Sequence, residues 1–214
     1  MKRLAIFDFD GTLFDSIWDV LTCFNQTLEM YGLPTLTRED LIPCLGGNID
    51  EIASLVLGEH NTPENLEKIK TTYLDFYNSS KKELTVPFPK ALDLLKKLQE
   101  KGVILAINSN RLTYSLEELV AKYFPEIDFI AIEGHNHENP SKPDAYGANE
   151  IIKKADVNAC DAVYIGDSIT DILTAKNAGI DCIIVKWGYG LQKDFEDEYL
   201  LDVIDDFEEI VKYF

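Results

Sequence analysis

A short apolar run near the N-terminus stops abruptly at two carboxylates, and this stretch constrains the fold more than any other. The run is Leu-Ala-Ile-Phe at positions 4–7, and Asp8, Asp10, Gly11 and Thr12 follow it. Four apolar residues are too few for a globular helix and suit a buried strand. Side chains alternate along an extended chain, so Asp8 and Asp10 can face one cavity. Open α/β sheets bind ligands at the carboxyl ends of their strands, so the stretch predicts an acidic site there.

The rest of the chain shows two successive patterns. Residues 16–82 carry helical spacing only, with helices expected at 18–31, at 49–57 and from 63 onward. After a proline-rich junction at 86–89, strands and helices alternate to the C-terminus. The expected strands are 103–107, 129–132, 162–165 and 182–185, and the expected helices are 91–101, 113–124, 144–154, 169–178 and 207–214. Alternation of this kind predicts a parallel sheet covered on both faces, with the helical segment inserted after the first strand.

Charge and cysteine usage limit the partners and the compartment. The formal net charge is −18, which repels long nucleic acids and anionic membranes but leaves a small phosphate ester possible. The four cysteines lie far apart without paired spacing, which indicates reduced thiols in a cytoplasmic protein. The apolar run after the basic N-terminal tripeptide is interrupted by Asp8, so no signal peptide is expected. No run is long enough to cross a membrane.

Three more polar clusters stand next to predicted elements. Ser109 and Asn110 follow the second predicted strand, Lys142 precedes a helix, and Asp167 ends the strand at 162–165, with Asp171 four residues later. Taken singly, each cluster also suits an ordinary role such as a helix-capping turn or a surface lysine. Asn110 and nearby backbone N–H groups can donate hydrogen bonds to an anion bound at this strand end.

The first and last clusters together indicate a cation. Asp8, Asp10 and Asp167 would all project from strand ends on one edge of a parallel sheet. Unpaired carboxylates so close together repel one another unless a cation holds them. Carboxylate oxygens are the ligands that a hard cation such as Mg²⁺ prefers, and Mg²⁺ is the expected cofactor.

The four clusters, in this order, closely resemble the four signatures of the haloacid dehalogenase-like hydrolases, over essentially the whole chain. The resemblance implies a Rossmann-like catalytic core formed by residues 1–15 and 83–214, with an inserted helical cap at 16–82. It also implies that Asp8 is a nucleophile that accepts a phosphoryl group and that Asp10 is the general acid and base.

The resemblance extends to the other candidate residues. It implies that Ser109 binds the transferring phosphoryl group and that Lys142 offsets its charge. It further implies that Asp8 and Asp167 ligate Mg²⁺ through carboxylates, Asp10 through its backbone carbonyl, and that Asp171 is an outer or lysine-pairing residue. The residues expected to contact the substrate are Gly11, Thr12, Asn110 and, in a cap loop similar in place to the family's specificity loop, Gly46 and Gly47.

The predicted function is a Mg²⁺-dependent phosphatase acting on a small phosphorylated metabolite through an aspartyl-phosphate. A sugar phosphomutase on the same fold is one alternative, and analysis of the products separates the two. A haloacid dehalogenase lacks the acid–base aspartate, so Asp10 argues against that activity. A non-catalytic phosphorylation switch, like a response-regulator receiver, is the alternative of a different class, but receivers are much shorter and lack the helical insert.

Two stretches have no assigned place in this mechanism. Glu133, His135, His137 and Glu138 cluster before Lys142, but no further histidine or cysteine lies nearby to complete a zinc site, so a polar loop is expected. Trp-Gly-Tyr-Gly at 187–190 resembles a segment of phosphoglycolate phosphatase-like members. The particular phosphate ester and the oligomeric state stay open from the sequence.

Overall fold

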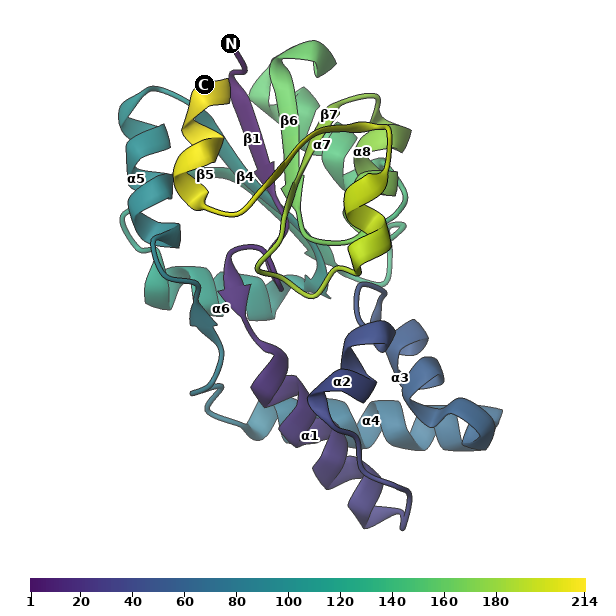
Figure 1. Ribbon diagram of the computed structural model, residues 1–214. Coiled ribbons are helices and arrows are strands. Elements are labelled where there is room, and N and C mark those ends of the chain that lie inside the picture. The colour runs from purple at the N-terminus through teal and green to yellow at the C-terminus, as the bar shows by residue number, and fades with distance from the viewer. The chain divides into compact units, whose positions relative to one another are not determined.

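The computed structural model describes residues 1–214, which form two compact units. The first unit combines Met1–Phe14 with Pro87–Phe214, and the second comprises Asp15–Val86. The first contains a sheet between helices and the second is helical (Figure 1). The chain leaves and re-enters the first unit through β2 (Phe14–Asp15) and β3 (Val86–Pro87), which form a two-stranded sheet.

A six-stranded sheet organises the first unit, and every neighbouring pair in it is parallel. The spatial order is β5-β4-β1-β6-β7-β8. The strand bounds are β1 Leu4–Phe7, β4 Ile104–Leu112, β5 Phe129–His135, β6 Ala162–Gly166, β7 Asp181–Val185 and β8 Leu200–Ile204. The chain passes from β1 to β4 and β5 on one side of β1, and then to β6, β7 and β8 on the other side. The strand order therefore reverses beside β1. Such a switch point leaves a crevice at the strands' carboxyl ends.

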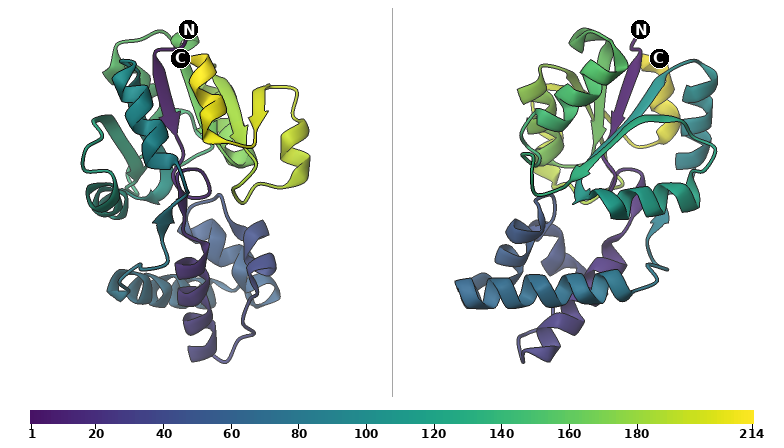
Figure 2. Two further views of the ribbon diagram at one scale, coloured as in Figure 1. Left: turned by 60° about the vertical axis from the view of Figure 1, so that its left-hand side comes forward. Right: turned by 180° about the vertical axis from the view of Figure 1, so that it is seen from behind.

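Helices cover both faces of this sheet (Figure 2). Their bounds are α5 Ala91–Glu100, α6 Thr113–Tyr123, α7 Tyr146–Ala155 and α8 Ile169–Ala178, with 3₁₀ helices η3 Ala159–Asp161, η4 Gln192–Glu196 and η5 Phe207–Tyr213. The side chains of β1 divide between two apolar cores, Ala5 and Phe7 on one face and Leu4 and Ile6 on the other. All four are fully buried, which explains the continuous apolar run. The predicted α/β class with a covered parallel sheet is confirmed.

The structure departs from the expected elements in three places. β8 was not predicted, because its alternation is weak and Asp202 interrupts it. β4 continues to Leu112, so Ser109 and Asn110 lie inside a strand whose pairing with β5 is irregular after Asn108. The closing helix is a 3₁₀ helix, η5.

The second unit contains α1 (Ile17–Met30), α2 (Arg38–Leu41), η1 (Ile42–Cys44), α3 (Ile49–Leu57), η2 (Gly58–His60) and α4 (Pro63–Ser79). Thr37 and Asp40 form a reciprocal capping box at the start of α2. Between α1 and α4 the rings of Phe24 and Tyr73 stack with centroids 4.0 Å apart. No helix of the chain is both long and apolar enough to cross a bilayer.

Candidate active site

The carboxyl end of β1 places Asp8 at the centre of the first unit's sheet edge. The Asp8 N–H donates to the carbonyl of Ile165 in β6 at 2.8 Å, so ladder bonding continues one residue beyond the strand. The chain then turns sharply at Gly11, which has φ of 85°. A side chain at Gly11 would also strike the carboxylate of Asp167, so only glycine lets the two loops approach this closely.

Lys142 is a buried cation between two buried carboxylates. Its Nζ donates to Asp8 Oδ1 and to Asp171 Oδ1, both at 2.7 Å. All three side chains are at most 8% exposed. Burial lowers the pKa of Lys142, but the charges of Asp171 and Asp8 outweigh it and hold that pKa well above its usual value. Lys142 therefore stays charged beside Asp8.

Asp171 is fixed by both of its oxygens. While Oδ1 accepts from Lys142, Oδ2 accepts from the backbone N–H groups of Asp167 and Ser168 at 3.1 Å each, and from the Ser168 hydroxyl. Asp171 thus caps the N-terminus of α8 and pairs with the lysine at the same time. The same side chain therefore caps a helix and pairs with a lysine of the candidate active site.

Asp167 follows β6 and completes the acidic cluster. One carboxylate oxygen each of Asp8, Asp167 and Asp171 lies within 4.8 Å of the others. Burial raises the pKa of Asp8 to about 7, with Lys142 opposing and Asp171 adding to the shift. Burial, then the charges of Asp171 and Asp8, raise the pKa of Asp167 well above its usual value. These hard oxygen donors, crowded and short of positive charge, fit a divalent cation.

The loop after β7 holds Asp167 from the other side. The backbone N–H of Tyr189 donates to Asp167 Oδ2, and a side chain at Gly188 would collide with the same carboxylate. Trp187 Nε1 donates to the carbonyl of Thr12 at 3.0 Å, which ties this loop to the one after β1. The loop that contains residues 187–190 therefore packs against the acidic cluster.

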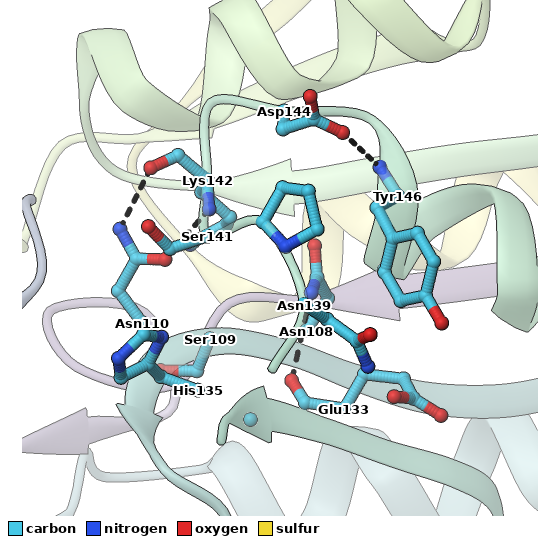
Figure 3. Close-up of a pocket in the computed structure, with 13 residues that line it drawn as sticks. Asn108, Ser109, Asn110, Glu133, His135, Asn139, Ser141, Lys142, Asp144 and Tyr146 are labelled. Carbon is cyan, nitrogen blue, oxygen red and sulfur yellow. Dashed lines mark hydrogen bonds between the residues drawn. The ribbon is translucent and has the colours of Figure 1, made fainter. Parts of the chain in front are cut away.

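Asn110 holds the backbone of Lys142 from the end of β4. Its Oδ1 accepts from the Lys142 N–H at 2.7 Å and its Nδ2 donates to the Lys142 carbonyl at 3.0 Å (Figure 3). In the structure both ends of the Asn110 amide are hydrogen-bonded to the backbone of Lys142, and contact of Asn110 with the substrate stays a prediction. Ser109 is buried beside it, and its Oγ accepts from the Arg111 N–H at 3.1 Å, which leaves the hydroxyl proton available for a phosphate oxygen.

A polar pocket opens beside Ser109 and Lys142, between the ends of β4 and β5 and the loop before α7 (Figure 3). Its lining consists of Asn108, Ser109, Asn110, Glu133, Gly134, His135, Asn139, Pro140, Ser141, Lys142, Asp144, Tyr146 and Gly147. Within the loop, His135 Nε2 and His137 Nδ1 lie 3.0 Å apart. No third metal-ligating side chain joins these two histidines.

Asp10 is not one of the three clustered carboxylates and pairs instead with Arg111, a residue outside the four sequence motifs. Arg111 Nε donates to Asp10 Oδ2 at 2.9 Å, and Nη2 donates to Oδ1. One signal in the sequence is that Arg111 is the only arginine between residues 87 and 214, and it directly follows the Ser109-Asn110 motif.

Gly46, Gly47 and Thr12 are the remaining residues expected to contact the substrate. Gly46 and Gly47 belong to the second unit, just before α3. A side chain at Gly47 would collide with Glu51, which caps α3 together with Asn48. Thr12 is fully buried, and its hydroxyl has no hydrogen-bond partner. A substrate-binding role for these three residues stays a prediction.

Comparisons with known proteins agree with the fold and the motifs. The family model described as haloacid dehalogenase-like hydrolase matches residues 5–185. A phosphoglycolate phosphatase of Agrobacterium fabrum is 31% identical, over 88% of this chain and 82% of the relative. Another, from Pseudomonas fluorescens, is 28% identical over 99% of this chain and 79% of the relative. The crystal structure of an inferred phosphoglycolate phosphatase from Lactobacillus delbrueckii subsp. bulgaricus matches with a TM-score of 0.91 and 29% identity, covering 98% and 97% of the two chains.

The family model spans all four motifs, from the strand that precedes Asp8 to the strand that follows α8. The six-stranded parallel sheet is shared with the crystal structure over nearly the full length of both chains. The chain therefore belongs to the haloacid dehalogenase-like hydrolase family, as its motifs predicted, and within that family it is similar to the phosphoglycolate phosphatases.

Proposed function

We propose that this hydrolase cleaves a small phosphate monoester through an aspartyl-phosphate on Asp8, with Mg²⁺ held by Asp8, Asp167 and the backbone carbonyl of Asp10. The observation that carries the proposal is the buried group of three carboxylates around Lys142 at the sheet's switch point. A bound divalent cation would neutralise phosphoryl oxygens and orient the ester for attack.

In the first half-reaction, Asp8 attacks phosphorus in line with the bond to the leaving oxygen. The ammonium of Lys142 and the hydroxyl of Ser109 stabilise the negative charge on the phosphoryl oxygens. Asp10 donates a proton to the leaving alcohol. Because Lys142 is already charged and fixed between two carboxylates, little reorganisation is needed when the phosphoryl group arrives.

In the second half-reaction, water hydrolyses the aspartyl-phosphate. Asp10, now a carboxylate, takes a proton from the water, and Asp8 is regenerated as the phosphate departs. Two separate carboxylates, one for covalent chemistry and one for proton transfer, are therefore required within reach of one phosphorus atom.

The relatives named as phosphoglycolate phosphatases support a small phosphorylated acid as the first candidate substrate. The test is a panel of phosphoglycolate, sugar phosphates and nucleoside monophosphates with Mg²⁺, assayed for inorganic phosphate. We expect release of phosphate from at least one small ester. Isomerisation of a sugar phosphate without phosphate release would instead indicate a mutase, and no reaction with any ester would contradict the proposal.

Removing divalent cations is expected to abolish turnover, because three crowded carboxylates cannot by themselves bind a phosphate dianion. EDTA should stop phosphate release, and added Mg²⁺ should restore it. Ca²⁺ should restore it poorly, since it prefers more ligands and a looser geometry than Mg²⁺. Full activity in EDTA would show that the site works without a metal.

The second unit is proposed as a cap that selects the substrate and excludes water. Replacing residues 17–82 with a short linker is feasible because β2 and β3, which flank the segment, are hydrogen-bonded neighbours. Activity on the best substrate should then collapse, while activity on p-nitrophenyl phosphate falls much less. Circular dichroism checks that the remaining unit is folded, and equal losses on both esters would argue against a selecting cap.

The cellular compartment is inferred from the state of the cysteines. All four cysteines are free thiols, with Cys23 and Cys182 buried and Cys160 exposed. Free and partly exposed thiols suit the reducing cytoplasm. We therefore expect a cytoplasmic location and a small phosphorylated metabolite as the partner, with no nucleic acid polymer.

A further inference from the structure

A shielded ion pair joins Arg111 to Asp10, and none of the four motifs includes Arg111. The guanidinium donates through Nε to Asp10 Oδ2 at 2.9 Å and through Nη2 to Asp10 Oδ1 at 2.5 Å. Because each nitrogen binds a separate oxygen, the two groups meet in a bidentate arrangement that fixes the plane of the carboxylate. The Arg111 side chain is 8% exposed and that of Asp10 29%, so solvent and salt screen this pair less than a surface pair.

Arg111 is itself held by three separate contacts. Its Nη1 donates to Ser115 Oγ in α6 at 3.3 Å, and its guanidinium carbon lies 5.6 Å from the centre of the Phe9 ring. Its backbone N–H donates to Ser109 Oγ at 3.1 Å. A guanidinium held by a helix residue and packed over a ring can impose an orientation on its partner, which a mobile surface arginine cannot.

We propose that Arg111 is a positioning residue for Asp10, fixing the carboxylate so that it can exchange protons with the leaving oxygen and then with water. The proposal rests on the acid–base role of Asp10 proposed above. Asp10 lies beyond the end of β1, where an aspartate side chain has several accessible rotamers, and the two hydrogen bonds select one of them. Since Arg111 also binds Ser109 Oγ, one residue links the proton-transferring carboxylate to the hydroxyl expected at the phosphoryl group.

The two half-reactions depend on Asp10 to different extents, and the choice of substrate separates them experimentally. Phosphorylation of Asp8 by p-nitrophenyl phosphate hardly needs an acid, because nitrophenolate is a good leaving group. Hydrolysis of the aspartyl-phosphate needs Asp10 as a base whatever the substrate was. A residue that acts through Asp10 therefore affects the second step and the cleavage of alkyl esters, and it leaves the first step with an aryl ester intact.

The test is the Arg111→Gln variant, assayed in the presence of Mg²⁺. Steady-state kcat on an alkyl phosphate is expected to fall by about 10–100-fold with little change in KM, as is typical when a supporting partner of a site residue is removed. With p-nitrophenyl phosphate, a burst of about one nitrophenolate per active site should precede the slow steady state. Arg111→Lys should recover only part of the rate, because an ammonium cannot form both hydrogen bonds in one plane.

Lys97→Gln is the matched control, since it removes an exposed lysine that pairs with Glu208 in the same unit, and it should behave like the wild type. If Arg111→Gln keeps wild-type turnover while Asp10→Asn stalls, the positioning role is wrong and the proposed function stands. If Arg111→Gln loses the burst and the turnover equally, the residue is merely structural and the proposal is overturned. If Asp10→Asn itself turns over at the wild-type rate, the acid–base assignment fails and the role of Arg111 fails with it.

Discussion

Asp8→Asn is expected to abolish both phosphoenzyme formation and turnover, whereas Asp10→Asn should trap the phosphoenzyme. The first substitution removes the nucleophile, so no ester can phosphorylate the protein. The second keeps the nucleophile but removes the group that transfers protons. An alkyl phosphate should then fail at the first step, because its alkoxide is too basic to leave without a proton.

Acetyl phosphate or p-nitrophenyl phosphate separates the two aspartates most clearly. With these good leaving groups, Asp10→Asn should still phosphorylate Asp8 and then stall, because no base activates the water. General acid–base residues typically contribute about 10²–10⁴-fold, so the stall is large enough to measure. The expected observations are a stoichiometric burst of leaving group and an acyl-phosphate that hydroxylamine cleaves. A burst in Asp8→Asn, or wild-type turnover in Asp10→Asn, would show that the two roles are assigned wrongly.

Lys142→Met is expected to remove nearly all activity and much of the stability of the metal-free protein. The variant loses the cation that meets the phosphoryl group, which should lower kcat by about 10²–10³-fold. It also leaves Asp8 and Asp171 buried without their ionic partner. Breaking a buried ion pair by removing one partner costs about 3–5 kcal/mol of the free energy of unfolding. Denaturant unfolding in EDTA, together with phosphate release in Mg²⁺, measures both effects.

The loss in the free energy of unfolding caused by Lys142→Met should increase as the pH rises. In the wild type, burial raises the pKa of Asp8 from 3.8 to about 7 even though Lys142 lowers it. Without Lys142 this pKa rises further, so the folded state binds a proton that the unfolded state releases above its own pKa. Both proteins are affected alike by the raised pKa of Asp8 up to about pH 7, so the extra loss in the variant should be nearly constant from pH 5 to pH 7 and should grow as the pH rises above 7. A loss that is constant from pH 5 to pH 8 would contradict this account.

Asn110→Ala provides a milder companion to Lys142→Met. It keeps the lysine but removes the two hydrogen bonds that hold the Lys142 backbone. Activity should fall less than in Lys142→Met, and adding Asn110→Ala to Lys142→Met should cause no further loss, since both act through the same ammonium. Additive losses would mean that Asn110 contacts the substrate directly, as the sequence suggested. Lys97→Met serves as the control for the loss of a lysine elsewhere in the unit.

The sequence by itself determined the features that depend on neighbouring residues. The run at positions 4–7 predicted a strand buried on both faces, because an apolar side chain at every position requires a core on each side. The bounds of α3 and α8 match the expected 49–57 and 169–178, since caps and helical spacing are local signals. The order of the four motifs predicted the family, which the comparisons confirm.

Only the tertiary structure decided which polar groups meet at the sheet edge. Arg111 and Asp10 are 101 residues apart in the chain, and Asn110 and Lys142 are 32 apart. No periodicity or cap encodes such pairs, because they depend on where loops from different strands end once β4, β1 and β6 are side by side. β8 escaped detection for the same reason, since an edge strand interrupted by Asp202 gains its stability from pairing with β7 rather than from its own pattern. Local sequence patterns predicted where the motifs lie along the chain, and the packing of the sheet gave each side chain its partner.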